Sequence, residues 1–127
     1  MTGKAGKRRQ RRVLVVDDHD MLRSGLSLAL SAAGYSVDSA ADGMAALAAV
    51  SQSRPDVVVL DLRMPVLDGH ATLARLRADP ATADIPVVIA TAAEDQRSRI
   101  LADGAAAFVT KPIDAYQLLR EVSLALG

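Results

Sequence analysis

The chain has 127 residues and a formal net charge of zero, and half of its residues are hydrophobic. This length suits one domain with a substantial core, and the absence of cysteine excludes disulfides and thiolate metal sites. No apolar run approaches the roughly 18 residues that a membrane span needs, and none follows the basic N-terminus as in a secretory signal, so we expect a cytoplasmic protein.

The net charge of zero hides an uneven distribution. Residues 1–12 carry six positive charges and no acidic side chain, whereas residues 13–127 carry nine Arg or Lys against fifteen Asp or Glu, a net charge of −6. We therefore divide the chain into a basic, disordered tail of residues 1–11 and one domain of residues 12–127. Such a tail suits nucleic acid or a membrane surface, although a solvated extension is the more common case. The excess of twelve Arg over three Lys, with abundant Ala, favours a bacterial source.

Five short runs predict strands. Three of them are continuously apolar, as in strands of a parallel sheet that is covered by helices on both faces. A fourth run alternates between apolar and polar residues and predicts an edge strand, and a short fifth run suits the other edge. The expected strands are 13–16, 35–39, 57–60, 87–90 and 107–110.

Helical patterns separate these runs. Gly34 is expected to end the first helix, Asp42 to cap the second, and Asp114 with Gln117 resembles a capping box at the start of the last. Five successive strand–helix pairs predict an α/β fold with an open parallel sheet and right-handed crossovers. The expected helices are 21–33, 44–50, 71–78, 94–102 and 116–126.

Polar side chains follow four of the expected strands, at the point where each strand ends. Asp17 and Asp18 follow the first strand, Asp61 the third, Thr91 the fourth and Lys111 the fifth. The carboxyl ends of parallel strands meet at one edge of the sheet, which is where open α/β sheets bind their ligands. Each residue alone is more often a turn, cap or solvated residue, but five together in an acidic domain favour a functional site.

This set of side chains suits phosphoryl transfer with a divalent cation. Three carboxylates repel one another, and Mg²⁺, which prefers oxygen ligands, relieves the repulsion and leaves a position for a phosphoryl oxygen. Thr91 is placed to donate a hydrogen bond to a second phosphoryl oxygen, and Lys111 to pair with a third. One carboxylate then remains as the nucleophile, since carboxylates form acyl phosphates.

The chain resembles the response-regulator receiver domains of bacterial two-component signalling from about Arg12 to its C-terminus. The fold that this resemblance implies is flavodoxin-like, with five parallel strands in the order 2-1-3-4-5 and helices on both faces. The motifs that carry the resemblance are Val15-Val16-Asp17-Asp18, Leu60-Asp61-Leu62-Arg63-Met64-Pro65-Val66-Leu67-Asp68-Gly69, Thr91-Ala92 and Lys111-Pro112.

By resemblance, Asp61 is the phosphoacceptor, and Thr91 and Lys111 complete the catalytic set. The bond between Lys111 and Pro112 is expected to be cis. The implied magnesium ligands are the side chains of Asp17, Asp18 and Asp61 and the backbone carbonyl of Arg63.

The resemblance also implies a switch. Thr91 moves toward the phosphoryl group, and Phe108 matches the aromatic residue that rotates inward on activation. The fourth helix, the fifth strand and the fifth helix then present a changed face to an output protein or domain. Two positions are implied to affect the rate of dephosphorylation in opposite directions. Arg63 is a long cation beside the phosphoryl group, and Ala93 is a small residue that leaves access to that group open.

The implied function is that of a regulatory phosphoacceptor and not of an enzyme with a separate substrate. A histidine kinase or a histidine phosphotransfer protein supplies the phosphoryl group, and the domain catalyses only its own phosphorylation and autodephosphorylation. Homodimers through the switching face are common in the family. We expect no direct binding of nucleic acid by the domain body.

Neither histidine is expected to take part in the site. His19 follows the acidic pair, but Mg²⁺ favours oxygen ligands over imidazole. His70 is expected to be an exposed residue at the start of a helix.

Three other interpretations are weighed against this one. An aspartate-based phosphohydrolase normally requires a second catalytic Asp at the position of Arg63. It also requires a substrate cap, for which 127 residues leave no room. A scaffold that works without phosphorylation is disfavoured because the acidic residues, Thr91 and Lys111 are all present. The third is the receiver part of a longer DNA-binding response regulator, for which the stretch Asp17-Asp18-His19 is typical.

Overall fold

The computed structural model describes residues 10–127, which form one five-stranded parallel sheet in the order β2-β1-β3-β4-β5. This is the predicted fold, with the alternating strand and the short fifth strand at the two edges. The strands are β1 (Arg12–Val16), β2 (Ser36–Ala40), β3 (Val57–Leu60), β4 (Val87–Thr91) and β5 (Ala107–Thr110). The helices are α2 (Asp20–Ala32), α3 (Gly43–Gln52), α4 (Gly69–Ala78), the 3₁₀ turn η1 (Glu94–Gln96), α5 (Arg97–Ala102) and α6 (Ala115–Leu126).

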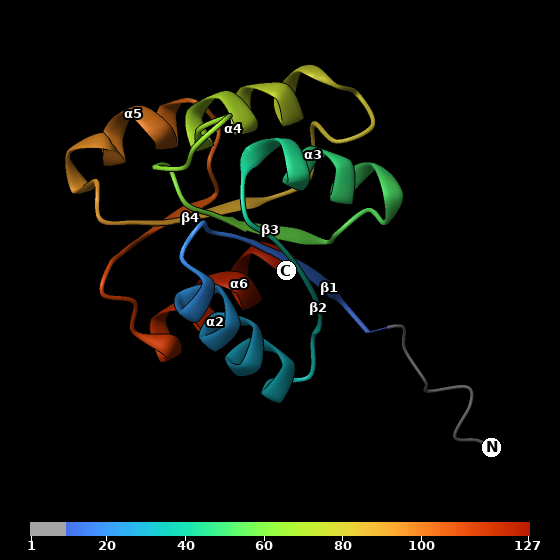
Figure 1. Cartoon of the computed structure of the whole chain (residues 1–127), viewed down its shortest axis with the longest axis vertical. Coiled ribbons are helices and arrows are strands. Elements are labelled where there is room, and N and C mark those ends of the chain that lie inside the picture. Colours follow the sequence, from blue (N-terminus) through green and yellow to red (C-terminus); the bar gives the residue numbers. More distant parts are fainter. Residues whose placement is uncertain (1–9) are drawn as a thin grey trace.

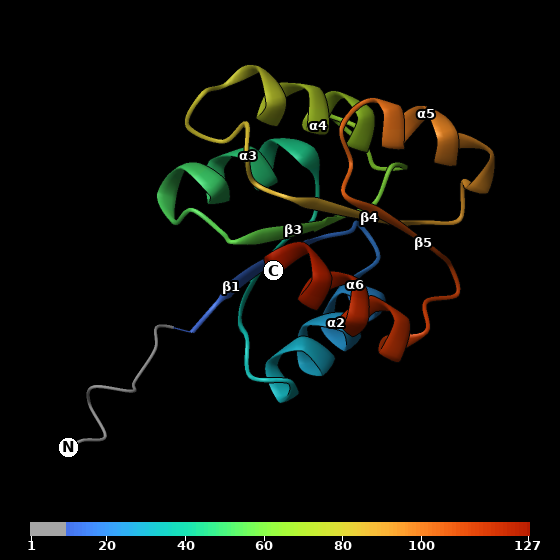
Figure 2. The same cartoon turned by 180° about the vertical axis from the view of Figure 1, so that it is seen from behind.

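The helices cover both faces of the sheet. Figure 1 and the reverse view in Figure 2 show α3, α4 and α5 on one face and α2 and α6 on the other. Successive side chains of a strand point to opposite faces. In β1, Val13 and Val15 therefore pack toward α2 and α6, whereas Leu14 and Val16 pack toward α3, α4 and α5. Both layers need apolar partners, and this explains why the central strands are apolar at every position except Arg12 at the start of β1 and Thr91 at the end of β4.

Local side-chain hydrogen bonds cap two helix starts at the predicted residues Asp42 and Asp114, although within residues 10–127 the Gln117 side chain makes no return bond that would complete the expected capping box. Asp42 accepts a hydrogen bond from the backbone N–H of Ala45 at 2.8 Å, and Asp114 accepts one from that of Tyr116 at 2.9 Å. Gly34, just after α2, has a φ of 101°, a conformation that favours glycine.

The helix expected over 94–102 is different in its first turn. Residues Glu94–Gln96 form a 3₁₀ turn, and the α-helix begins at Arg97. No side chain caps this start, and the N–H of Gln96 instead donates to the carbonyl of Ala93 at 3.0 Å. A tightened first turn of this kind satisfies backbone groups that lack a capping side chain.

Most of the predicted tail, residues 1–9, lies outside the described residues. Its last two residues contact the domain: the Gln10 amide donates to the carbonyl of Gly34 at 3.1 Å, and the Arg11 guanidinium donates to that of Leu126 at 3.3 Å. Among residues 10–127, no helix has the length and apolar character that crossing a lipid bilayer requires.

Gly69 lets α4 begin directly against the strand end that carries Asp61. A methyl group at this position would overlap the carbonyl oxygen of Asp61 and the Cα atom of Leu62. Backbone atoms cannot move aside as a flexible side chain can, so this approach requires glycine.

We expect Gly69→Ala to lower the free energy of unfolding by about 1–3 kcal/mol, because the added methyl group forces α4 away from β3. The matched control is Gly25→Ala in α2, where a methyl group meets no atom within 4 Å. That change should raise stability by about 0.5–1 kcal/mol through better helix propensity. Urea unfolding followed by circular dichroism measures both, and equal effects of the two substitutions would contradict the close approach.

Candidate functional site

Four neighbouring strands bring the predicted polar residues to one edge of the sheet. Asp17 follows β1, Asp61 follows β3, Thr91 ends β4 and Lys111 follows β5, and these strands are adjacent in the order β1-β3-β4-β5. Thr91 pairs in register with Thr110, and the N–H of Lys111 donates to the Thr91 carbonyl at 2.9 Å. Residues far apart in the sequence therefore converge through strand pairing alone.

The ammonium group of Lys111 joins the carboxylates of Asp17 and Asp61. Its Nζ atom lies 2.8 Å from Oδ2 of Asp17 and 2.9 Å from Oδ2 of Asp61. The two Asp side chains are only 3% and 5% exposed, and that of Lys111 is 17% exposed. Buried carboxylates need such a partner, because an unpaired charge at this depth is strongly destabilising.

The environment raises the pKa of Lys111 above its ordinary value. Burial acts against the charged ammonium, but the hydrogen bonds and negative charges of Asp17 and Asp61 outweigh it. Lys111 therefore stays protonated throughout the neutral range.

Backbone N–H groups hold the other oxygen of each buried carboxylate. The N–H of His19 donates to Oδ1 of Asp17 at 2.9 Å, and the N–H of Arg63 donates to Oδ1 of Asp61 at 3.2 Å. Arg23, which the sequence analysis did not single out, donates to the carbonyl of Asp17 at 2.8 Å. The two N–H bonds orient the carboxylates, and the Arg23 bond fixes the backbone of Asp17.

Asp18 is the more exposed member of the acidic pair, with 37% of its side chain accessible. The imidazole Nδ1 of His19 lies 3.7 Å from Oδ1 of both Asp17 and Asp18. Their ligand atoms lie within 4.8 Å of one another, close enough to hold one ion. The structure thus places the imidazole of His19, which the sequence analysis left outside the site, next to the acidic pair.

Thr91 and Ala93 lie buried beside the acidic cluster. The Thr91 hydroxyl accepts a hydrogen bond from the N–H of Ala93 at 3.4 Å. Within residues 10–127 it makes no hydrogen bond to Asp61 or Lys111. The structure thus places Thr91 at the same sheet edge but does not join it to the charged group.

Phe108 lies with its ring turned into the protein, where its residue is only 4% exposed. It packs in the core cluster on the side of α3, α4 and α5. The guanidinium carbon of Arg97, at the start of α5, lies 5.3 Å from the ring centroid, within cation–π range. The bond between Lys111 and Pro112 is cis, as expected.

A shallow pocket of about 410 Å³ lies against the segment that follows Asp61, and the predicted tuning residues Arg63 and Ala93 line it together with His70 and Gln96. The expectation that His70 is exposed is wrong. Its Nδ1 atom is buried and has no hydrogen-bond partner among the described residues. Because α4 starts at Gly69, His70 falls inside the first turn, next to the segment that carries Ala93 and Gln96.

Comparison with known proteins identifies the family. The model of the response regulator receiver domain matches residues 13–123, so the chain belongs to this family. It is 42% identical over 113 residues to the response regulator PleD of Caulobacter vibrioides, covering 87% of this chain and 25% of that protein. It is 39% identical over 113 residues to the DNA-binding dual master transcriptional regulator RpaA of Synechocystis, covering 87% of this chain and 47% of that protein.

Solved structures agree with this membership. The chemotaxis response regulator CheY4 of Vibrio cholerae superposes with a TM-score of 0.86 at 32% identity, covering 93% of this chain and 100% of that one. The chain spans less than half the length of the two regulators matched by sequence, 25% and 47%. What those whole proteins do is therefore not transferred to this chain by similarity alone.

We expect Lys111→Met to lower the free energy of unfolding by about 2–4 kcal/mol at neutral pH. The substitution keeps the apolar stem but leaves Asp17 and Asp61 buried without their cation. Urea unfolding followed by circular dichroism measures the change, and a variant as stable as the wild type would show that the ammonium group does not hold the carboxylates.

The same pair of proteins tests the raised pKa of Lys111. Because the pKa of Lys111 is raised in the folded state, its ion pairs contribute their full stabilisation below the ordinary lysine pKa of about 10.4. This stabilisation is lost as the pH rises through the pKa of Lys111 in the folded protein. The stability difference between wild type and variant should therefore shrink only in strongly alkaline solution. Lys111 is the only lysine among residues 10–127, and the contributions of Tyr35 and Tyr116 cancel because both proteins contain them.

Proposed function

We propose that this receiver domain is the phosphoacceptor of a two-component system and takes a phosphoryl group on Asp61. The observation that carries the proposal is the hydrogen-bonded group Asp17–Lys111–Asp61, buried at the carboxyl edge of the sheet. The role of the domain is regulatory, since the reactions it catalyses are its own phosphorylation and autodephosphorylation.

The donor atoms at the site fit a magnesium ion. Asp17 shares one candidate cation group with Asp18 and is linked to Asp61 through Lys111, so three negative charges stand against one positive charge, an excess of two. Mg²⁺ prefers carboxylate and carbonyl oxygens, and we propose these three side chains and the backbone carbonyl of Arg63 as its ligands. When bound, Mg²⁺ would supply positive charge to the oxygens of the transferring phosphoryl group.

The transfer reaction exchanges one bond to phosphorus for another. A carboxylate oxygen of Asp61 forms the new O–P bond while the N–P bond of a phosphohistidine on the donor protein breaks. The electron pair of that bond returns to the imidazole, which takes a proton. Asp61 suits the role because its backbone bond to Arg63 and its contact with Lys111 hold the carboxylate in one orientation.

The new charge is proposed to change the surrounding contacts. The acyl phosphate carries close to −2 charges at neutral pH in place of the single charge of the Asp61 carboxylate, and its oxygens extend further from the main chain, which favours a hydrogen bond from the Thr91 hydroxyl and an ion pair with Lys111. The Thr91 hydroxyl now accepts only a long bond from Ala93, so little opposes its movement. The consequence is a population shift that alters the face formed by α5, β5 and α6.

The buried ring of Phe108 bears on this switch. Its inward position in the structure is the one that the family resemblance assigns to the activated state. The proposed shift therefore begins from a domain in which the Phe108 ring already has its inward position.

Partners follow from the family and remain proposals. Input comes from a histidine kinase or a histidine phosphotransfer protein in the cytoplasm. Output goes to a downstream protein or domain. A homodimer through the α5-β5-α6 face is compatible with both kinds of output. Because RpaA, a DNA-binding transcriptional regulator, is about twice as long as the matched segment, a second proposal is that this chain is the receiver part of such a regulator.

Mass spectrometry of the intact protein tests the phosphoacceptor proposal. Incubation with Mg²⁺ and a small-molecule phosphodonor should add the mass of one phosphoryl group to the wild type. The gain should be absent in Asp61→Asn and in a sample with a metal chelator. Asp95→Asn is the matched control, because this exposed carboxylate bonds only to the neighbouring Gln96, and it should be phosphorylated like the wild type.

Two outcomes would overturn the proposal. An equal gain in Asp61→Asn would place the modification elsewhere. No gain with the small donor or with phosphorylated histidine phosphotransfer proteins would favour a scaffold that acts without phosphorylation.

A further inference from the structure

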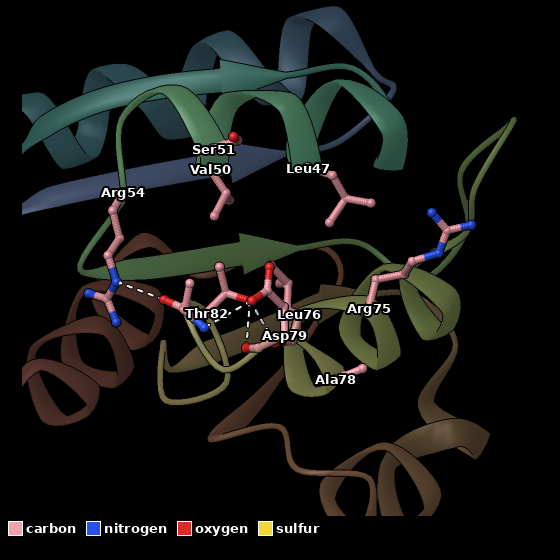
Figure 3. A pocket seen from close by; sticks show the side chains of 10 residues that line it. Leu47, Val50, Ser51, Arg54, Arg75, Leu76, Ala78, Asp79 and Thr82 are labelled. Atoms are coloured by element: carbon pink, nitrogen blue, oxygen red, sulfur yellow. Dashed lines mark hydrogen bonds between the residues drawn. The ribbon is translucent and has the colours of Figure 1, made fainter.

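A groove between α3 and α4 lies away from the phosphorylation site. It has a volume of about 620 Å³, within the range of small-molecule sites. Leu47 and Val50 extend from α3 toward α4, and Leu76 of α4 lies opposite them (Figure 3). Because α4 starts at Gly69 beside Asp61 and Leu76 lies near its other end, the groove occupies the opposite part of this helix.

Most polar groups of the groove already have partners within the protein. The Arg54 guanidinium donates to Asp84 at 2.8 Å and to the carbonyl of Ala81 at 3.3 Å. The Thr82 hydroxyl donates to the carbonyl of Leu76 at 2.7 Å. These groups shape one end of the groove, but their hydrogen bonds are used.

Arg75 is different. Within residues 10–127 its guanidinium makes no hydrogen bond or ion pair, although it lines the groove. In Figure 3 its side chain rises from α4 at the end beyond Leu47, whereas Arg54 lies at the opposite end. Residues 13–127 carry a net charge of −6, and Arg75 places a positive charge without a partner among the described residues at the rim of an apolar groove.

We propose that this groove binds a small amphipathic carboxylate, with its apolar body against Leu47, Val50 and Leu76 and its carboxylate on Arg75. A guanidinium fork matches a carboxylate with two parallel hydrogen bonds, and the apolar walls exclude water from one side of the pair. The carboxylate of Asp79 already accepts a bond from the N–H of Ala81, and its negative charge directs the anionic end of the ligand toward Arg75.

The test uses three naphthalene probes that share one apolar body and differ in charge: 2-naphthoate, neutral 2-naphthalenemethanol and the 2-naphthylmethylammonium cation. Probe fluorescence can be excited without interference from tryptophan, because the chain has none. We expect saturable binding of the carboxylate, about fivefold to tenfold weaker binding of the neutral probe, and no saturation with the cation. Amide shifts in an NMR titration should map to α3, α4 and residues 79–82.

Variants assign the charge to one residue. Arg75→Gln should weaken 2-naphthoate binding by about fivefold to tenfold and leave the affinity for the neutral probe unchanged. Arg120→Gln is the matched control, because Arg120 is also an exposed helical arginine but lies on α6, on the other face of the sheet. This variant should bind all three probes like the wild type.

Several results would overturn the proposal: no binding of 2-naphthoate, equal affinity for the carboxylate and the cation, unchanged binding by Arg75→Gln, or amide shifts confined to another surface. Both arginines are exposed, so the fold should persist, and circular dichroism of each variant verifies it. The test is independent of phosphorylation, since no probe or variant involves Asp61.

Discussion

The molecule is organised around an excess of negative charge at one buried edge of its sheet. Three aspartates gather where β1 and β3 end, and a single ammonium group, from Lys111, reaches two of them at 2.8 and 2.9 Å. The contact holds the carboxylates in place but supplies only one positive charge for three negative ones, and this excess is the basis of the proposed binding of a divalent cation and a phosphoryl group. The carboxylate charges that Lys111 leaves unneutralised lower the stability of the fold, and the same charges give the domain its proposed chemistry.

The rest of the fold supplies the geometry for this charge cluster. The apolar residues of the central strands bury both faces of the sheet, and the order β2-β1-β3-β4-β5 places the ends of β1, β3, β4 and β5 side by side. Gly69 then lets α4 start against the backbone of Asp61. Backbone N–H groups from the following loops orient Asp17 and Asp61, so the position of each carboxylate is determined by the main chain.

Much of the site could be predicted from the sequence, because it depends on where strands end. A polar residue directly after an apolar run is visible in the sequence, and parallel topology then brings Asp17, Asp61 and Lys111 together. Contacts between separate loops leave no such signal: the partial burial of His70 depends on the segment after β4. The proposed groove also depends on tertiary structure, since Leu47 and Arg75 become neighbours only when α3 packs beside α4.

The most direct test of this account is the free energy of unfolding measured at increasing Mg²⁺ concentration, with a monovalent salt matched for ionic strength. If the uncompensated carboxylates bind the ion in the folded state, stability should rise with Mg²⁺, by about 1.4 kcal/mol for each tenfold increase above the dissociation constant. The monovalent salt should give only a small change by screening. Identical stability in the two salts at every concentration would contradict the claim that excess negative charge defines the site.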